Sequence, residues 1–194
     1  TNFNSAWRDC YSLASFPLID TSSGTNFVAT WRNCSDLTTF LQIDTSSATT
    51  FQNTWMGCNF LNSFPTIDTS NASNITGTWR SCARIITFPS LDFSSGANFE
   101  RAWNGCTRMT TYPANQFDTT GTFTSNAFHN SLRGCALTAQ SIENILTSLD
   151  TNGAQNITLA IQGGTNAAKT TWSTAANTAY TNLVNKGWTI SYNY

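Results

Sequence analysis

Two kinds of reactive side chain recur along this sequence at a fixed interval, and the first is cysteine. Five thiols are evenly spaced along the chain: Cys10, Cys34, Cys58, Cys82 and Cys106. Metal sites draw on cysteines about two to four residues apart, and the sequence has no such pair. Stacked repeats would bring successive thiols within disulfide distance, yet a column of five leaves one unpaired. We therefore expect a column of buried thiols that fill space in the core. Cys135 should have the same structural role, although it is out of register with the other five.

Aspartate is the second recurring group, as Asp20, Asp44, Asp68, Asp92 and Asp118. In a stack of repeats these carboxylates would lie about 4.8 Å apart and repel one another, unless amides or a cation compensated them. The simpler interpretation is an Asx-turn at the start of each "DTSS" stretch, in which the carboxylate accepts from the amide two residues on. Calcium is the alternative, weakened because each repeat supplies one carboxylate and Ca²⁺ takes roughly six to eight ligands.

No constellation typical of an enzyme accompanies these columns. His129 is the only histidine, and nothing near it suggests a base paired with a nucleophile. The stretch "IQGGTN" (161–166) lacks both the glycine spacing and the lysine of a phosphate-binding loop. Asp36, Glu100 and Glu143 could supply a carboxylate pair for glycoside hydrolysis, but nothing in the sequence singles them out. The sequence therefore predicts a protein without catalytic residues and without a cofactor.

Composition argues against two classes of function. The chain has 194 residues, a net charge of −1 and 10% charged residues, so it has no basic excess for binding nucleic acid. A run of about 18 apolar residues, as a membrane-spanning segment needs, is missing.

Residue 1 is a threonine that falls in the middle of the repeat pattern. We therefore expect this chain to be the C-terminal part of a larger polypeptide or assembly.

The recurring residues belong to tandem repeats of constant length. Four repeats align without a gap, at 1–24, 25–48, 49–72 and 73–96, and a fifth spans 97–121 with one extra residue near Asn115. Repeats of this length are typical of solenoids, in which each repeat buries its apolar face against its neighbours.

Two apolar patterns alternate within each repeat. In the second repeat, Phe27, Trp31 and Cys34 have helical spacing and predict a short helix. The stretch "LTTFLQI" (37–43) favours a short strand, and such strands should stack into a parallel sheet. Exposed tryptophans could stack on sugar rings, but this spacing places the column that includes Trp31 on the buried stripe.

Residues 138–194 follow a different pattern. Thr138 should cap a helix that ends at Gly153, and a second helix should span roughly 166–186. The stretches "NITLAIQG" and "WTISYNY" read as strands. The predicted fold is thus an α/β repeat solenoid over residues 1–137, with a parallel sheet of short strands and short helices, closed by a C-terminal helix–strand cap in the same continuous domain.

The pattern C-x-x-L-x-x-F-P-x-I-D-T-S-x-x-T-x-F-x-x-x-W, found across residues 1–121, resembles a known family. It is similar to the leucine-rich repeats of BspA-like surface proteins, and closest to their DUF285 type. It departs from that type in its tryptophan, where methionine or phenylalanine is usual, and in Leu41, which interrupts the proline column. With "ALTAQSIENILTSLDTNG" it is also similar to repeat proteins of marine cyanophages. The resemblance implies a leucine-rich-repeat-like solenoid in an extracellular place, on a cell surface or a virion, and brings no catalytic residues.

Function should lie where the repeats differ from one another. The repeats share an apolar column that should point inward, formed by Leu13, Leu37, Leu61, Ile85 and Met109. The side chains at the two positions on either side of this column change in size and charge from repeat to repeat. The first reads Ser12, Asp36, Phe60, Arg84 and Arg108, and the second reads Ala14, Thr38, Asn62, Ile86 and Thr110. Because both positions flank a buried column, they should project outward from the strand face, which solenoids use for binding.

We expect a ligand to contact this face at Asp36, Phe60, Asn62, Arg84 and Arg108. Phe60 offers an aromatic platform and the two arginines offer planar donors, which suit a glycan or an acidic polymer. The sequence therefore predicts a non-enzymatic recognition or adhesion module whose partner is a cell-surface glycan or a protein receptor. Two alternatives stay open: this face is ordinary solvated surface, or the chain is a purely structural spacer or decoration of a virion or cell envelope.

Overall fold

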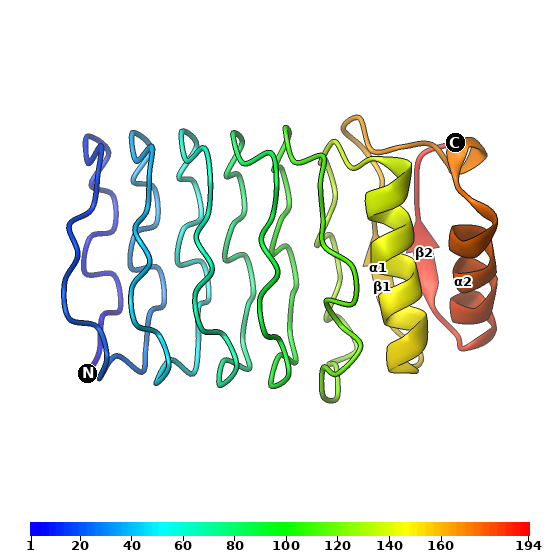
Figure 1. Ribbon diagram of the computed structural model, residues 1–194, viewed down its shortest axis with the longest axis horizontal. Helices are drawn as coiled ribbons and strands as arrows, with labels where there is room; N and C mark the ends of the chain where they lie inside the picture. Colours follow the sequence, from blue (N-terminus) through cyan, green and yellow to red (C-terminus); the bar gives the residue numbers. More distant parts are fainter.

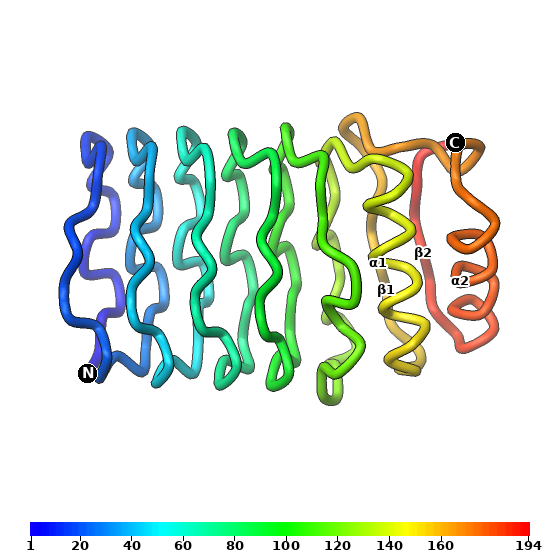
Figure 2. The backbone as a smooth tube through the Cα atoms, in the orientation of Figure 1, coloured from blue at the N-terminus to red at the C-terminus, as the bar shows by residue number.

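In the computed structural model, which describes residues 1–194, the repeats lie side by side along the long axis of the molecule (Figure 1). The backbone trace shows each repeat as one elongated loop of chain with two long sides (Figure 2). Parallel bridges join equivalent residues of successive repeats, among them Asn2 with Asn26 and Asn26 with Thr50. The N-terminus therefore lies at one end of the molecule, and the C-terminal helices lie at the other.

One long side of each repeat, the tryptophan side, comprises residues 26–34 and their equivalents. Here alternate amides bond to the next repeat, as when the Trp31 amide donates to the Thr54 carbonyl at 2.9 Å. The amides between them bond locally, as when Arg32 donates to the Ala29 carbonyl at 3.2 Å. Every second amide thus ties a repeat to its neighbour, so this side depends on stacking for its conformation.

The prediction of a short helix on the tryptophan side is wrong, because residues 1–137 contain no helix. Ala29 and Asn33 have φ angles of 53° and 62°, in the left-handed region. A right-handed helix cannot continue through a left-handed residue at every fourth position. The same two positions are left-handed in the other repeats, at Ser5, Asp9, Asn53, Gly57, Gly77, Ser81, Arg101 and Gly105.

The other long side, the variable side, comprises residues 35–43 and their equivalents. The predicted sheet of short strands is reduced here to single parallel bridges, such as the one between Ser15 and Thr39. Leu37 and Phe40 are both buried, and they stand at every third position. A pleated strand turns every second side chain to the same face, so inward side chains at every third residue prevent a continuous strand.

A column of stacked indole rings runs through the core. Neighbouring rings from Trp7 to Trp103 lie 5.5 to 6.3 Å apart, with interplanar angles of 5° to 11°. Phe40 of the variable side meets Trp31 edge to face at 4.8 Å. The two long sides therefore face each other across the core, and their exposed side chains point in opposite directions. Four of these indoles are fully buried, which confirms that the column is core: Trp31, Trp55, Trp79 and Trp103.

Polar groups in the core satisfy backbone carbonyls of neighbouring repeats. Each buried cysteine donates its thiol hydrogen to the carbonyl of the tryptophan one repeat earlier, with sulfur–oxygen distances of 3.1 to 3.2 Å. The buried Thr54 hydroxyl donates to the Phe27 carbonyl at 2.8 Å. The same carbonyls also accept from amides of their own repeat, as the Trp31 carbonyl does from the Cys34 amide at 3.1 Å, so each side chain supplies a second donor. The thiols and hydroxyls thus bond as well as fill space.

The regular register of the repeats continues further than the sequence alignment places it. Phe117 stacks at 6.1 Å on Phe93, which occupies the same position in the preceding repeat and lies one repeat length earlier in the chain. Beyond it, Phe128 stacks at 5.3 Å on Phe99, and the separation of these two in the chain exceeds one repeat length. The extra residues therefore lie between Phe117 and Phe128, and the prediction of one extra residue near Asn115 is wrong.

Residues 138–194 form two α-helices and a two-stranded parallel sheet at one end of the molecule (Figure 1). The order is α1 (Ala139–Asn152), β1 (Thr158–Ala160), the 3-10 helix η1 (Lys169–Thr171), α2 (Thr174–Asn185) and β2 (Thr189–Ser191). As predicted, α1 follows Thr138, whose hydroxyl accepts from the Ser141 amide, and ends at Gly153, where φ is 81°. The second helix begins later than predicted, because the side chain of Ser173 caps it.

The C-terminal segment continues the hydrogen bonding of the repeats. A parallel bridge joins Phe128 to Leu159 in β1, and Leu159 pairs with Ile190 in β2. The Ser141 hydroxyl of α1 donates to the Thr110 carbonyl of the fifth repeat at 2.9 Å. One cluster of 47 buried apolar residues extends from the repeats into this segment. The whole chain therefore shares a single core.

Candidate functional site

The cysteines are arranged as structural groups. All six are free thiols, and every one except Cys10 is buried. Burial raises the pKa of the Cys34 thiol to about 11 and that of Cys106 to about 12. These thiols are protonated at neutral pH, which suits a hydrogen-bond donor and does not suit a nucleophile or a metal ligand.

Four of the recurring aspartates form Asx-turns at the corners of the repeats. The Asp44 carboxylate accepts from the Ser46 hydroxyl at 2.7 Å and from its amide at 3.0 Å. The amide bond recurs at Asp20, Asp68 and Asp92. The serine hydroxyl and amide hold the pKa of Asp20 and of Asp44 below the ordinary value. No group of three or more His, Cys, Asp or Glu side chains is arranged to hold a metal ion.

The assignment of Asp118 to this column is wrong. Gln116 stands one repeat length after Asp92, within the register that extends to Phe117. It is buried, and its side chain exchanges two hydrogen bonds with the backbone of Leu91. Asp118 instead accepts from the Ser148 hydroxyl of α1 at 2.5 Å. Its side chain therefore joins the fifth repeat to the C-terminal segment.

The residues considered for catalysis are not assembled into a site. The His129 ring shares a hydrogen bond with the Asn130 side chain at 2.8 Å. Glu100 lies on the tryptophan side and forms an ion pair with the arginine that follows it. Glu143 belongs to α1 and accepts from the serine that caps α2. Asp36 is exposed on the variable side, in a different repeat from Glu100.

The side chains expected to bind a ligand are all exposed on the variable side: Asp36, Phe60, Asn62, Arg84 and Arg108. Arg84 reaches back by one repeat, so that its guanidinium carbon lies 4.0 Å from the centre of the Phe60 ring. Phe60 retains 40% of its surface exposed, and Ile86 in the next repeat retains 45%. The structure therefore places an exposed aromatic ring directly beside a cation.

Backbone bonds between repeats fix the positions from which these side chains project. The Phe60 amide donates to the Ser35 carbonyl at 3.2 Å, and the Asn62 amide donates to the Thr38 carbonyl at 3.1 Å. The Ser35 and Thr38 hydroxyls also bond to the preceding repeat, whereas the side chains of Asp36 and Asn62 have no hydrogen-bond partner and leave their polar atoms available. This face combines a fixed backbone with free side-chain groups.

The positive charge on the variable side has no partner within the chain. The three ion pairs of the protein join Arg8 to Asp9, Arg101 to Glu100 and Lys186 to Asp150. Neither Arg84 nor Arg108 takes part in them. Both guanidinium groups are exposed and can donate to a ligand in the planar geometry that suits carboxylates and paired hydroxyls.

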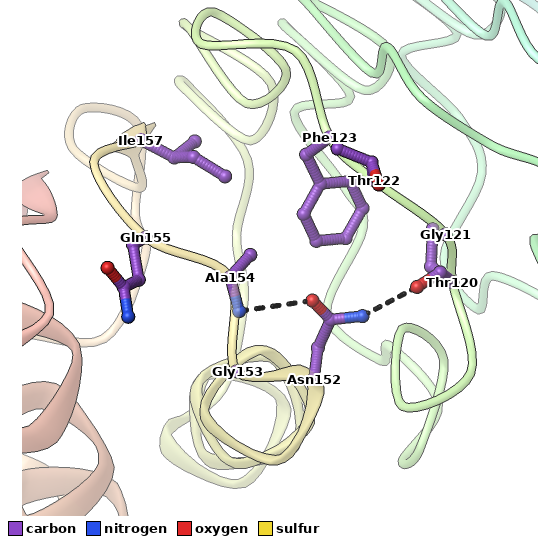
Figure 3. A pocket seen from close by; sticks show the side chains of 9 residues that line it. All are labelled: Thr120, Gly121, Thr122, Phe123, Asn152, Gly153, Ala154, Gln155 and Ile157. Atoms are coloured by element: carbon purple, nitrogen blue, oxygen red, sulfur yellow. Dashed lines mark hydrogen bonds between the residues drawn. The ribbon is translucent and has the colours of Figure 1, made fainter.

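A cavity of about 410 Å³ lies between the end of the fifth repeat and the loop that follows α1 (Figure 3). Asn152 stands between its walls, donating to the Thr120 carbonyl at 2.8 Å and accepting from the Ala154 amide at 3.3 Å. Because both ends of this amide are occupied, Asn152 holds the walls together. No pattern in the sequence indicates this cavity, which arises from the extra residues after Phe117.

Comparisons with protein-family models, with curated proteins and with solved structures give no match for this chain. Within the structure, no helix combines the length and the apolar character needed to cross a bilayer. The functional argument therefore depends on the geometry of the variable side and on the chemistry of its exposed groups.

Proposed function

We propose that this chain is a non-enzymatic recognition module, built as a leucine-rich-repeat-like solenoid, that binds a glycan through its variable side. We place the protein on a cell surface or a virion, on the strength of the sequence resemblance.

The contact between Arg84 and Phe60 is the observation that carries this proposal. Sugar rings present C–H groups on one face and hydroxyl groups at their edges. The exposed part of the Phe60 ring offers a surface for the C–H groups, and the guanidinium 4.0 Å away offers donors for the hydroxyls. Arg108 adds a second exposed planar donor one repeat further on.

The scaffold supports binding because it is ordered before a ligand arrives. The amides of Phe60 and Asn62 are bonded to the preceding repeat, and the inward-pointing Leu61 between them is buried. Binding to a rigid backbone requires the ordering of a few side chains only, which lowers its entropic cost.

A structural spacer or decoration is the second candidate. The observation that favours it is the regular bonding of each repeat to its neighbours, which gives a stiff rod whether or not a ligand is present. A spacer needs no exposed aromatic–cation pair. The two candidates therefore differ in whether saturable binding exists.

The test is binding of the labelled protein to intact bacterial cells and to a panel of polysaccharides. The double variant Arg84→Gln, Arg108→Gln and the single variant Phe60→Ala should each weaken binding at least tenfold, and the double variant should do so without lowering the thermal midpoint. Arg133→Gln removes an exposed arginine elsewhere and serves as the matched control. Unchanged binding in the double variant would refute the site, and no binding of the unaltered protein to any cell or polysaccharide would favour the spacer.

A further inference from the structure

A polar groove of about 250 Å³ lies on the tryptophan side, opposite the row that includes Phe60. It spans four repeats, from the second to the fifth. Its lining residues are Arg32, Gln52, Asn53, Met56, Thr76, Gly77, Arg80, Glu100 and Arg101. Arg32, Met56 and Arg80 each follow the tryptophan of their repeat and so occupy equivalent positions. The uncharged Met56 therefore lies between the two arginines.

Two of the arginines in this groove have no anionic partner. Neither Arg32 nor Arg80 forms an ion pair, whereas Arg101 pairs with Glu100 at 3.6 Å. The Nε atom of Arg32 is buried and has no acceptor. A buried donor without an acceptor is unfavourable. The Arg32 side chain lines the groove and is only partly buried, so its other guanidinium N–H groups can donate to an acceptor from outside the chain.

The chain itself supplies no carboxylate to these two groups. Asp9, which lies one repeat before Asn33, is held by Arg8 at 3.2 Å and by the side-chain amide of Asn33 at 2.7 Å. The recurring aspartates lie at the corners and are engaged by serines. The positive charge of the groove is therefore open to an external anion.

We propose that this groove binds the carboxylate or sulfate group of an acidic saccharide. Arginine donates to such oxyanions through two parallel N–H groups. Gln52, Asn53 and Thr76 line the same groove and provide amide and hydroxyl groups that match sugar hydroxyls. Met56 is its single apolar side chain, so the groove has no pocket for the apolar anchor of a peptide.

This inference does not depend on the Phe60 row, because the two sites lie on opposite sides of the core. Trp31 on the tryptophan side packs edge to face against Phe40 on the variable side, so groups that point outward from the two sides point away from each other. Both sites can be filled at once. The protein then has two binding faces that can join two separate saccharide chains.

The test is calorimetric titration of the full chain with an oligogalacturonate, a sulfated oligosaccharide and a neutral oligosaccharide of equal length. The acidic oligomers should bind and the neutral one should not. Binding of either acidic oligomer supports the proposal, and comparing the two identifies the oxyanion. Arg32→Gln with Arg80→Gln should weaken that binding at least tenfold, while Arg133→Gln, at the equivalent column position outside the groove, should not change it.

Met56→Glu gives a second variant that keeps both arginines. It places a carboxylate between them, and we expect it to compete with the ligand and weaken binding at least tenfold. Full binding by both groove variants would overturn the proposal, as would equal binding of the neutral oligosaccharide. Arg84→Gln with Arg108→Gln separates the two sites: binding lost in that variant and kept in the groove variants would overturn the groove and support the Phe60 row.

Discussion

Replacing Trp55 with alanine tests the stacked core most directly. Trp55 is fully buried and lies between the indoles of Trp31 and Trp79, at 5.5 and 6.3 Å. Phe40 and Phe64 meet its edge at 5.2 and 4.8 Å. The substitution thus removes ring contacts to both neighbouring repeats and to both long sides.

The expected loss is about 4 kcal/mol in the free energy of unfolding, because large aromatic-to-alanine changes in a core cost about 3–5 kcal/mol. Each aromatic pair adds about 0.5–1.5 kcal/mol beyond the buried area. Against this, the Trp55 indole N–H is buried without an acceptor, and its removal relieves about 1–3 kcal/mol. The partial cancellation keeps the estimate within the usual range for such a substitution.

Trp7→Ala is the matched comparison, because Trp7 is only partly buried and stacks on one indole. We expect it to cost about 2 kcal/mol, half the loss at Trp55. Guanidinium unfolding followed by far-ultraviolet circular dichroism measures both variants without relying on tryptophan fluorescence. Equal losses at the two positions, or a loss below about 1 kcal/mol at Trp55, would refute the argument that two-sided stacking carries the stability.

Two further predictions concern the thiols and the carboxylates. Iodoacetamide at neutral pH should modify Cys10 alone in the folded protein, because the other thiols are buried; more than one adduct in the mass spectrum before unfolding would contradict this. Ser46→Ala should raise the pKa of Asp44 toward 3.8, measured by carbon-13 NMR titration, since the serine bonds lower it in the folded chain. When the pKa of a carboxyl is lower in the folded chain than in the unfolded chain, it stabilises the fold at pH above the unfolded-state pKa. That stabilisation is lost as the pH falls through the folded-state pKa. Because Ser46→Ala reduces this difference in pKa, the variant should lose less stability on acidification below pH about 4. An unshifted Asp44 pKa in Ser46→Ala would show that these bonds do not set it.

The core residues could be predicted from the constant length of the repeats, but the backbone conformation of each repeat could not. Trp55 and Cys58 recur because the same position meets the same neighbours in every repeat. The left-handed residues that replace the expected helix include Ala29 and Arg101, types that carry no preference for that region. Bonds to the next repeat impose their conformation, and no local pattern encodes such bonds.

The register after the fifth repeat failed for a similar reason. Asp118 begins a "DTT" that looks like the earlier "DTSS", so sequence alone aligns it with the aspartate column. The structure instead puts the uncharged Gln116 there, turned inward onto Leu91. A buried glutamine at a carboxylate position leaves no sequence signal, because its partner is a backbone group.

The candidate sites divide in the same way. Exposure of Arg84 and Phe60 follows from their place beside a buried column, and variation between repeats identified them. The contact between the two crosses from one repeat to the next and depends on side-chain rotamers. The groove between Arg32 and Arg80 needs Met56 at the right place in an intervening repeat, and only the assembled stack shows that.

The parallel indoles have a consequence for how the protein absorbs light. Neighbouring rings of the column are nearly parallel and regularly spaced, so their electronic transitions couple and an excitation is shared among them. A coupled array of this kind produces a split circular dichroism band whose sign follows the small twist between successive rings. Separation of two neighbouring rings removes their share of the coupling and weakens the band. The circular dichroism of the indoles can therefore be used to follow whether neighbouring repeats remain stacked.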